Sequence, residues 1–338
     1  MDDRRRKRTK KTLPYKSSVE RVSKFLKLFK RKDTLLILID PDPDSLASAM
    51  AVKRLLWQRV RKVTIAIIKE MQRVDNLAMV KLLKIPLVKI GHINPEGFTR
   101  RVLVDSQPQH HEALQGHSYD AVIDHHPRTK ALKAPFLDIR PEYGANSTIL
   151  IEYLRCAGIK PPTKLATALL YAIRTDTDDF ERSGGEADVR QFQYIFRFAN
   201  RSLLQKIERS EFRLKDLCYF QRALENRTIG KKGLFVHLGR VPGPDICVQV
   251  ADFFMRIHGL GWSFVSGVSE GKLTVILRND GYRKDAGKLA KQAFGAYGSA
   301  GGHQGAARAE VPISVLREKG IKPSGTSLER FVKQRLKL

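Results

Sequence analysis

Aspartate and histidine side chains follow predicted strands, or end a predicted helix, at four places in the first 180 residues. Several carboxylates packed together repel one another, and a multivalent cation neutralises them. A mixture of carboxylates and imidazoles suits Mn²⁺ or Mg²⁺ rather than thiolate-bound zinc. The pattern therefore predicts a divalent metal site, provided that the fold brings the four places together. They are Asp40-Pro-Asp42-Pro-Asp44, Asp105, Asp124-His125-His126 and Asp176.

Each place alone also has a purely structural interpretation. The Asp40-x-Asp42-x-Asp44 spacing is that of a calcium-binding loop, but Ser45 stands where such a loop has glycine and Ala51 where it has glutamate. The Asp-His-His triplet could be a capped turn with two surface histidines, and the single aspartates could be helix caps or turn residues. The order of all four along the chain is what favours a metal site.

Alternating strand and helix patterns supply the elements that must position these residues. Alternation of this kind predicts an α/β fold whose parallel sheet is covered by helices on both faces. Because the carboxyl ends of parallel strands share one edge of the sheet, the acidic residues and histidines should converge there. The predicted strands are 34–39, 63–68, 101–104 and 120–123, and the predicted helices are 45–60, 76–83, 146–156, 162–173 and 187–198.

The pattern of the second half of the chain predicts a helical connector followed by a smaller α/β domain. Residues 202–226 have the pattern of one long, charge-rich helix. Strands are expected at 234–238, 262–268 and 273–277, with helices at 246–258 and 285–294. We therefore predict a basic arm and amphipathic helix at 1–32, a catalytic domain at 33–200, a connector at 201–228 and a substrate-binding domain at 229–338.

The chain is strongly basic. It has 338 residues, of which 62 are Lys or Arg and 35 are Asp or Glu, so that its formal net charge is +27. Residues 1–32 hold fourteen of the basic residues and three of the acidic ones. This charge favours polyanionic partners, namely nucleic acid, nucleotides or an anionic membrane surface, with a solvated tail as the alternative. The helical spacing of Val19, Val22, Phe25, Leu26 and Phe29 predicts a basic amphipathic helix. Such a helix can lie on a membrane, but we expect it to pack on its own domain.

The composition excludes several classes of protein. Its 42% hydrophobic and 29% charged content is typical of a globular protein. No apolar run approaches the length of a membrane span, and no secretion signal is recognisable. The three cysteines are too far apart to predict a disulfide framework or a zinc site. We therefore expect a cytoplasmic protein in a reducing compartment.

Taken together, the motifs resemble those of the DHH phosphoesterase superfamily, which is named for the triplet found here at 124–126. The N-terminal motifs match residues 40–48, Asp105, the triplet and residues 172–180. The C-terminal half resembles the DHH-associated domain through Ala251-Asp-Phe-Phe254, Arg278 and Gly301-Gly-His303-x-x-Ala306-Ala307. Size and two-domain plan are most similar to the nanoRNase and pAp-phosphatase group.

The resemblance implies roles for individual residues. Asp105 would bridge two metal ions, His126 would face the scissile phosphate, and Asp124 would orient the histidines. The implied metal ligands are Asp42, Asp44, Asp105, His125 and Asp176. The implied substrate-binding residues are Arg278, Gly301, Gly302 and His303.

Two positions depart from the family pattern. Leu38 stands where the nanoRNase motif has a histidine, and a leucine cannot bind metal. Asp40 gives the Asp-x-Asp-x-Asp form of RecJ-like members and could replace the missing ligand. Arg308 stands where the pattern has a glycine, so that a cation is added beside the predicted substrate site or the shape of that site is changed.

The resemblance implies a phosphodiesterase that uses two Mn²⁺ ions, or Mg²⁺, to hydrolyse short oligoribonucleotides (nanoRNA) to mononucleotides. One alternative keeps the chemistry and changes the substrate to pAp or to linear or cyclic dinucleotides. Another is a degenerate member that binds nucleotide or RNA without cleaving it, and a third is an RNA-binding module built around the basic arm. Longer nucleic acid could bind that arm, and homodimerisation is left open.

Overall fold

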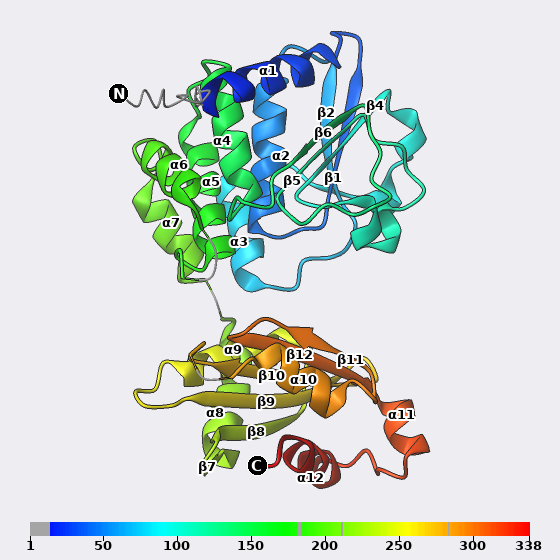
Figure 1. The fold of residues 1–338 in the computed structure, drawn as a ribbon, viewed down its shortest axis with the longest axis vertical. Coiled ribbons are helices and arrows are strands. Elements are labelled where there is room, and N and C mark those ends of the chain that lie inside the picture. The colour runs from blue at the N-terminus through cyan, green and yellow to red at the C-terminus, as the bar shows by residue number, and fades with distance from the viewer. Residues whose placement is uncertain (1–13, 182–183, 211, 283) are drawn as a thin grey trace, which may run out of the picture. The chain divides into compact units, whose positions relative to one another are not determined.

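The computed structural model describes residues 14–338 except 182–183, 211 and 283, and it divides the chain into two compact units (Figure 1). The division lies between residues 211 and 212. Residues 1–13, which hold most of the predicted basic arm, lie outside the described residues. No helix among the described residues combines the length and the apolar character that a membrane crossing needs.

The N-terminal unit is built on a six-stranded parallel sheet with the strand order β3-β2-β1-β4-β5-β6. After β1 the chain adds β2 and β3 on one side and then returns to add β4 on the other side of β1. This reversal is a topological switch point, where the carboxyl ends of the strands leave a crevice for ligands. The strands are β1 (Thr34–Ile39), β2 (Lys62–Ile67), β3 (Val88–Lys89), β4 (Arg100–Val104), β5 (Ala121–Asp124) and β6 (Phe136–Ile139).

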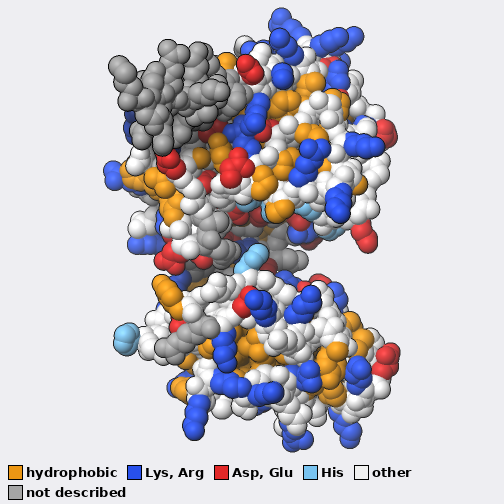
Figure 2. Space-filling view, in the orientation of Figure 1, with side chains coloured by type: hydrophobic (Ala, Val, Ile, Leu, Met, Phe, Trp, Pro, Cys, Tyr) orange, Lys and Arg blue, Asp and Glu red, His pale blue; other side chains and the backbone are white. Residues whose placement is uncertain are grey.

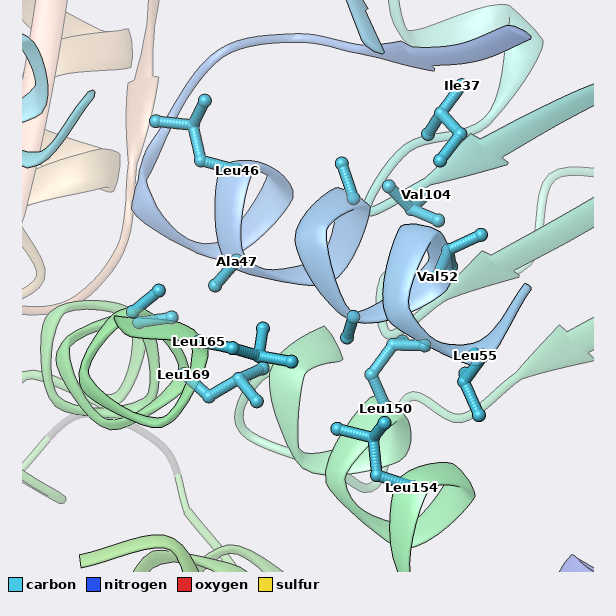
Figure 3. Packing of buried hydrophobic residues seen from close by; sticks show 14 of the residues in the cluster. Ile37, Leu46, Ala47, Val52, Leu55, Val104, Leu150, Leu154, Leu165 and Leu169 are labelled. Atoms are coloured by element: carbon cyan, nitrogen blue, oxygen red, sulfur yellow. The ribbon is translucent and has the colours of Figure 1, made fainter. Parts of the chain in front are cut away.

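Seven α-helices of the described residues pack into one core on one face of this sheet. In Figure 3, Ala47 of α2 faces Leu165 and Leu169 of α5, and Leu150 of α4 lies below α2. The helices are α1 (Pro14–Lys27), α2 (Pro43–Leu55), α3 (Val74–Leu83), α4 (Asn146–Cys156), α5 (Thr163–Thr177), α6 (Glu186–Phe196) and α7 (Arg201–Glu208).

The opposite face buries a second, smaller core, which includes Leu36, Leu38, Leu103 and Val122. Loops and short 3₁₀ helices cover it, including the one at Glu112–Leu114. The predicted α/β class and parallel sheet are confirmed. The cover therefore differs between the two faces, with α-helices on one and loops with short 3₁₀ helices on the other.

The C-terminal unit has a six-stranded mixed sheet between two layers of helices (Figure 1). Its order is β11-β12-β10-β9-β8-β7, and β8 and β9 are its parallel pair. Helices α10, α11 and α12 pack on one face, and α8 and α9 on the other. The elements are α8 (Leu217–Asn226), β7 (Thr228–Gly230), β8 (Gly233–Arg240), α9 (Asp245–Met255), β9 (Trp262–Ser269), β10 (Lys272–Asn279), α10 (Ala286–Phe294), β11 (Ser299–Gly302), β12 (Ala306–Pro312), α11 (Ile313–Glu318) and α12 (Gly325–Leu336).

The prediction of one continuous helix over 202–226 is wrong. The structure has two helices there, α7 and α8, and each packs into a different unit. The side chain of Asp216 accepts a hydrogen bond from the backbone N–H of Arg213 (3.1 Å), which starts a new helical segment. A charge-rich pattern with helical spacing does not reveal such a break, because both segments have the same period.

Helix α1 packs on its own domain, as the sequence predicted. Val22 and Phe25 are buried, and the Phe25 ring lies 5.1 Å from Phe29, 5.5 Å from Phe136 and 5.9 Å from Tyr153 between ring centroids. The apolar stripe of α1 is therefore part of the main core, and its basic residues remain on the outside.

Replacing Phe25 tests whether α1 is integral to the N-terminal unit. Because the ring is fully buried among three aromatic side chains, Phe25→Ala should lower the free energy of unfolding by about 3–5 kcal/mol. Urea denaturation of the full chain measures this loss. Val19→Ala, on the exposed side of the same helix, is the control and should cost less than about 0.5 kcal/mol. Equal values for the two variants would contradict the packing described here.

Candidate metal centre

The strands β1, β4 and β5 are neighbours, so the three strand-terminal motifs meet at one edge of the sheet. Asp105 directly follows β4, and Asp124 is the last residue of β5. The backbone of Asp105 adopts a left-handed conformation (φ 57°), which is uncommon for a residue other than glycine. Its N–H donates to the carbonyl oxygen of Ile123 (2.9 Å), and this bond holds the turn. The predicted convergence therefore follows from the strand order.

Two of the aspartates that follow β1 accept hydrogen bonds from N–H groups at helix N-termini. Asp42 caps α2, because its side chain accepts a hydrogen bond from the N–H of Ser45 (2.8 Å). Asp44 is buried and accepts from the N–H groups of Asn146 (2.6 Å) and Ser147 (2.8 Å) in the first turn of α4. The Asp44 carboxylate thus satisfies two orphan N–H groups of α4, and the positive end of the helix dipole favours its charge.

His125 lies at the centre of the cluster with a defined orientation. Its Nδ1 lies 3.1 Å from the carbonyl oxygen of Tyr143, which can only accept, so Nδ1 carries a proton. Its Nε2 faces Asp105 Oδ1 (3.4 Å) and Asp176 Oδ2 (3.1 Å). Apart from this contact with His125 Nε2, neither of these buried oxygens has a hydrogen-bond partner among the described residues. Two carboxylate oxygens that share one imidazole nitrogen fit a divalent cation.

Three overlapping sets of three ligand atoms have their members within 4.8 Å of one another. They are Asp44, His125 and Asp176; Asp105, His125 and His126; and His110, Asp124 and His126. The first two sets share His125 and the last two share His126, so the candidate ligands form one continuous cluster. Four of the six predicted metal ligands are thus brought together, namely Asp44, Asp105, His125 and Asp176.

The crowding of charge perturbs the pKa values of these groups. Burial, reinforced by the charge of Asp176, raises the pKa of Asp44 to about 7. Burial and the carboxylates of Asp42 and Asp44 raise the pKa of Asp105 well above its ordinary value. Burial disfavours the charged form of His125, but hydrogen bonds to Asp105 and Asp176 outweigh it and raise the pKa of His125 to about 12. Without a cation, His125 therefore supplies the positive charge of the site.

Asp124 orients His126, as the resemblance implied. Its Oδ1 lies 2.8 Å from His126 Nδ1, and its Oδ2 accepts from Gln107 Nε2 (2.7 Å). Burial opposes ionisation of Asp124, but the hydrogen bonds of His126 and Gln107 outweigh burial and lower the pKa of this carboxyl. The hydrogen bond to Asp124 in turn raises the pKa of His126. The side chain of His126 is 46% exposed, so Nε2 is open to a ligand.

Asp40 and Asp42 belong to none of the three-ligand sets of the described residues, although the side chain of Asp42 shares a hydrogen bond with Asp105 and so borders the cluster. Asp40 forms an ion pair with Lys69 (2.6 Å), which follows β2. Asp42 is exposed at the start of α2. Leu38 is fully buried in the second core of the sheet, beside Ala66 and Leu103 in the strand register.

Three residues that the sequence analysis did not single out support the cluster. Gln107 bridges Asp124 and the loop after the triplet, because its Oε1 accepts from the N–H of Thr129 (2.8 Å). The sequence signal that could have identified Gln107 is its position two residues after Asp105. Tyr143 contributes a backbone carbonyl, for which side-chain patterns give no signal, and the pairing of Lys69 with Asp40 depends on the strand order.

The predicted substrate residues lie in the C-terminal unit. Arg278 is at the end of β10 opposite Ala306 of β12, and its Nε donates to Asp252 Oδ1 (2.7 Å). The backbone N–H of His303 donates to the carbonyl oxygen of Ala306 (2.8 Å), so the strand register places the glycine-histidine turn beside Arg278.

The two glycines of this turn have different environments. Gly302 has φ 151°, and a Cβ there would meet the carbonyl oxygen of Ala306 at 2.3 Å, so this position requires glycine. A Cβ on Gly301 would meet nothing within 4 Å. Arg308 is opposite Gly301 in the register and pairs with Glu310.

These features define an α/β domain with a carboxylate and imidazole cluster at its switch point. Residues 34–173 match the model of the DHH family, N-terminal domain. The resemblance to this family that the motifs indicated is therefore confirmed over these residues. The match covers every metal-ligand candidate except Asp176, which lies three residues beyond it.

Comparison with individual proteins extends the similarity over most of the chain. It is 32% identical over 290 residues, or 85% of its length, to an uncharacterized protein of Methanocaldococcus jannaschii. The chain spans 60% of the length of that relative.

Two solved structures share the fold. An exopolyphosphatase-related protein from Bacteroides fragilis superposes with a TM-score of 0.68 at 14% identity, over 95% of this chain and 98% of the other. RecJ from Thermus thermophilus in complex with Mn²⁺ gives a TM-score of 0.50 at 14% identity, over 95% of this chain and 55% of RecJ.

The protonation of His125 predicts that binding of Mn²⁺ releases protons. With its pKa raised to about 12, His125 carries a proton at neutral pH that a cation at Nε2 must displace. Asp44, with a pKa of about 7, loses a further fraction of a proton. The affinity should therefore rise with pH, by about tenfold per unit for each proton released.

Calorimetry in two buffers of different ionisation enthalpy measures the number of protons released. The wild-type chain should release at least one proton per bound Mn²⁺ at pH 7, and His125→Gln should release fewer. Binding without proton release would contradict coordination through His125 Nε2.

Proposed function

We propose that the protein is a metal-dependent phosphodiesterase that hydrolyses short oligoribonucleotides (nanoRNA) to mononucleotides. The observation that supports this most directly is the pair of buried carboxylate oxygens whose one partner among the described residues is His125 Nε2. The match of residues 34–173 to the DHH family model favours the same chemistry. RecJ, which shares the fold, was solved in complex with Mn²⁺, and this agrees with a site of carboxylates and imidazoles.

In this proposal the N-terminal unit holds the ions and the phosphate. Asp42, Asp44, Asp105, His125 and Asp176 would bind two Mn²⁺ or Mg²⁺ ions, with Asp105 between them. When bound, such ions activate water and neutralise the charge that develops at phosphorus. Side chains of the N-terminal unit would also position the phosphate. The hydrogen bond between Asp124 and His126 Nδ1 favours the imidazolium form of His126, and the Nε2–H of that form would be free to donate to a phosphate oxygen.

The proposal assigns catalysis to residues 33–200 and substrate recognition to residues 229–338. Arg278 would exchange its contact with Asp252 for a phosphate of the substrate, since arginine pairs with phosphate through two parallel hydrogen bonds. The open space at Gly301 lets a phosphate approach the backbone N–H groups closely. His303, which is exposed, is an additional donor beside them. Recognition of an end group close to the scissile bond favours short substrates.

A specific observation favours a second candidate, a degenerate member of the family that binds nucleotide or RNA without cleaving it. Leu38 replaces a histidine of the family motif, and Asp40, which could have replaced that ligand, is paired with Lys69. Activity on pAp or on linear and cyclic dinucleotides would use the same chemistry as the main proposal and is distinguished by its products.

Asp105→Ala tests the metal chemistry. Removing a carboxylate from a crowded acidic cluster relieves repulsion, so the variant should fold while its turnover is lost. The wild type and the variant are incubated with Mn²⁺ and labelled RNAs of two to twenty nucleotides, with pAp and diadenylate in parallel, and the products are resolved by length. The exposed Glu318→Ala in the C-terminal unit is the control and should retain full activity.

Each outcome of this assay distinguishes between the candidates. Preferential cleavage of the shortest RNAs supports the proposal, and cleavage of pAp or diadenylate alone supports the alternative substrates. Substantial turnover by folded Asp105→Ala would contradict the two-metal assignment. Nucleotide binding by a wild type that cleaves none of the substrates would favour the degenerate member.

Arg278→Ala tests the division of labour between the units. The KM for a phosphorylated dinucleotide should rise by about tenfold or more, because a charge-assisted hydrogen bond contributes about 1.5–3 kcal/mol. A small chromogenic phosphodiester, which needs no second domain, should be cleaved almost as before. Asp252→Asn is the matched control, since it removes the charged partner of Arg278 and keeps the cation. Equal losses on both substrates would show that Arg278 supports the fold instead.

A further inference from the structure

Trp57 is exposed at the amino end of the main sheet, in the turn that connects α2 to β2. Its exposed fraction is 62%, although the neighbouring Leu56 and Val60 are buried. Gln58 adopts a left-handed conformation (φ 61°), and the N–H of Arg59 donates to the carbonyl oxygen of Leu56 (3.0 Å). This tight turn directs the indole away from the core while its two apolar neighbours pack into it.

A second basic loop lies beside this turn. The N–H of Arg61 donates to the carbonyl oxygen of Asp33 (2.8 Å), which joins the turn to the segment between α1 and β1. Figure 2 shows Lys and Arg side chains along the end of the N-terminal unit where, in Figure 1, the dark-blue loops lead into β1 and β2. We call this surface the basic edge. It consists of Lys30, Arg31, Lys32, Trp57, Arg59 and Arg61, all of them exposed.

The charge of the basic edge is not compensated. None of its five cations forms an ion pair with any residue that the structure describes. The one acidic residue in the two loops, Asp33, is buried, accepts from the N–H of Lys30 (2.7 Å) and pairs with Arg100. The surface therefore presents five positive charges around one aromatic ring.

The basic edge is separate from the metal centre. In a parallel sheet the amino ends of all strands lie at one edge and the carboxyl ends at the other. The centre lies beyond the carboxyl ends of β1, β4 and β5, whereas the basic edge precedes β1 and β2. A strand of six residues spans about 20 Å, so no mononucleotide can contact both sites.

We propose that the basic edge binds single-stranded nucleic acid, with the backbone phosphates on its cations and a base stacked on Trp57. Positively charged grooves that carry aromatic side chains bind single strands in this way. Trp57 is the one exposed large apolar side chain between residues 28 and 62, all of which the structure describes. Insertion into a membrane surface would require a wider apolar face, and this composition therefore favours a flexible polyanion.

The two tryptophans of the chain allow a direct measurement of stacking. Trp262 is 9% exposed and stacks on Phe264, so a change in tryptophan fluorescence on binding reports mainly on Trp57. The full chain is titrated with a labelled single-stranded RNA 20-mer in EDTA, which prevents turnover, and both anisotropy and fluorescence are followed. Binding in EDTA is independent of the proposed hydrolysis, so either proposal can fail without the other.

Charge reversal with a matched control distinguishes a local site from general attraction. Arg59→Glu/Arg61→Glu should raise the Kd at least about tenfold at 0.15 M salt and reduce the slope of log K against log salt by about two. Lys322→Glu/Arg330→Glu changes the net charge equally at exposed positions of the C-terminal unit and should raise the Kd less than about threefold. Equal losses for both pairs would overturn the proposal.

Substitution of Trp57 tests the stacking itself. Trp57→Ala should raise the Kd at least about fivefold and abolish the fluorescence change, and Trp57→Phe should restore most of the affinity. Urea denaturation verifies that the variants are folded. Unchanged RNA affinity of Trp57→Ala would overturn the proposal. Loss of binding to vesicles containing phosphatidylserine, with RNA binding intact, would assign the basic edge to a membrane surface instead.

Discussion

The crowding of carboxylates around His125 is the constraint on which the N-terminal unit depends. Asp44, Asp105 and Asp176 all approach one imidazole, and each adds to the cost of ionising the others. The fold offsets part of this cost with donors from outside the cluster, above all the first N–H groups of α4. The remaining charge is balanced by the proton on His125, and a cation bound at Nε2 would take the place of that proton.

A buried polar network fixes the carbonyl oxygen that orients His125. The hydroxyl of Tyr143 donates to Glu152 (2.9 Å), and Arg140 binds both Glu152 (2.7 Å) and Asp138 (2.7 Å). The next residue, Gly144, donates its N–H to a carboxylate in α6, and a Cβ there would meet Thr177 Cγ2 at 2.7 Å. Hydrogen bonds therefore hold the backbone after β6 at two consecutive residues, Tyr143 and Gly144. This network, whose members are not candidate metal ligands, fixes the tautomer of His125.

Because the strands are parallel, the acidic cluster and the basic residues lie at opposite edges of the sheet. Its carboxyl edge gathers acidic side chains, because the loops there follow β1, β4 and β5 and meet at the switch point. Its amino edge receives the ends of α1 and α2, whose last turns carry basic residues. Cations near a helix C-terminus are favoured by the helix dipole. One sheet can thus carry a metal centre and a positively charged surface without either neutralising the other.

The sequence alone was sufficient for the strands that precede the acidic motifs, the order of the motifs and the types of ligand, but it missed β3, β6, β7, β11 and β12. The run 34–39 and the triplet 124–126 are local patterns, and strand period and ligand chemistry are local properties. The tertiary structure decided which residues pair across the sheet. It joined Asp40 to Lys69, turned His125 Nε2 toward Asp105 and Asp176, and divided the expected connector into two helices. These outcomes depend on which strands become neighbours, and no spacing along the chain encodes that order.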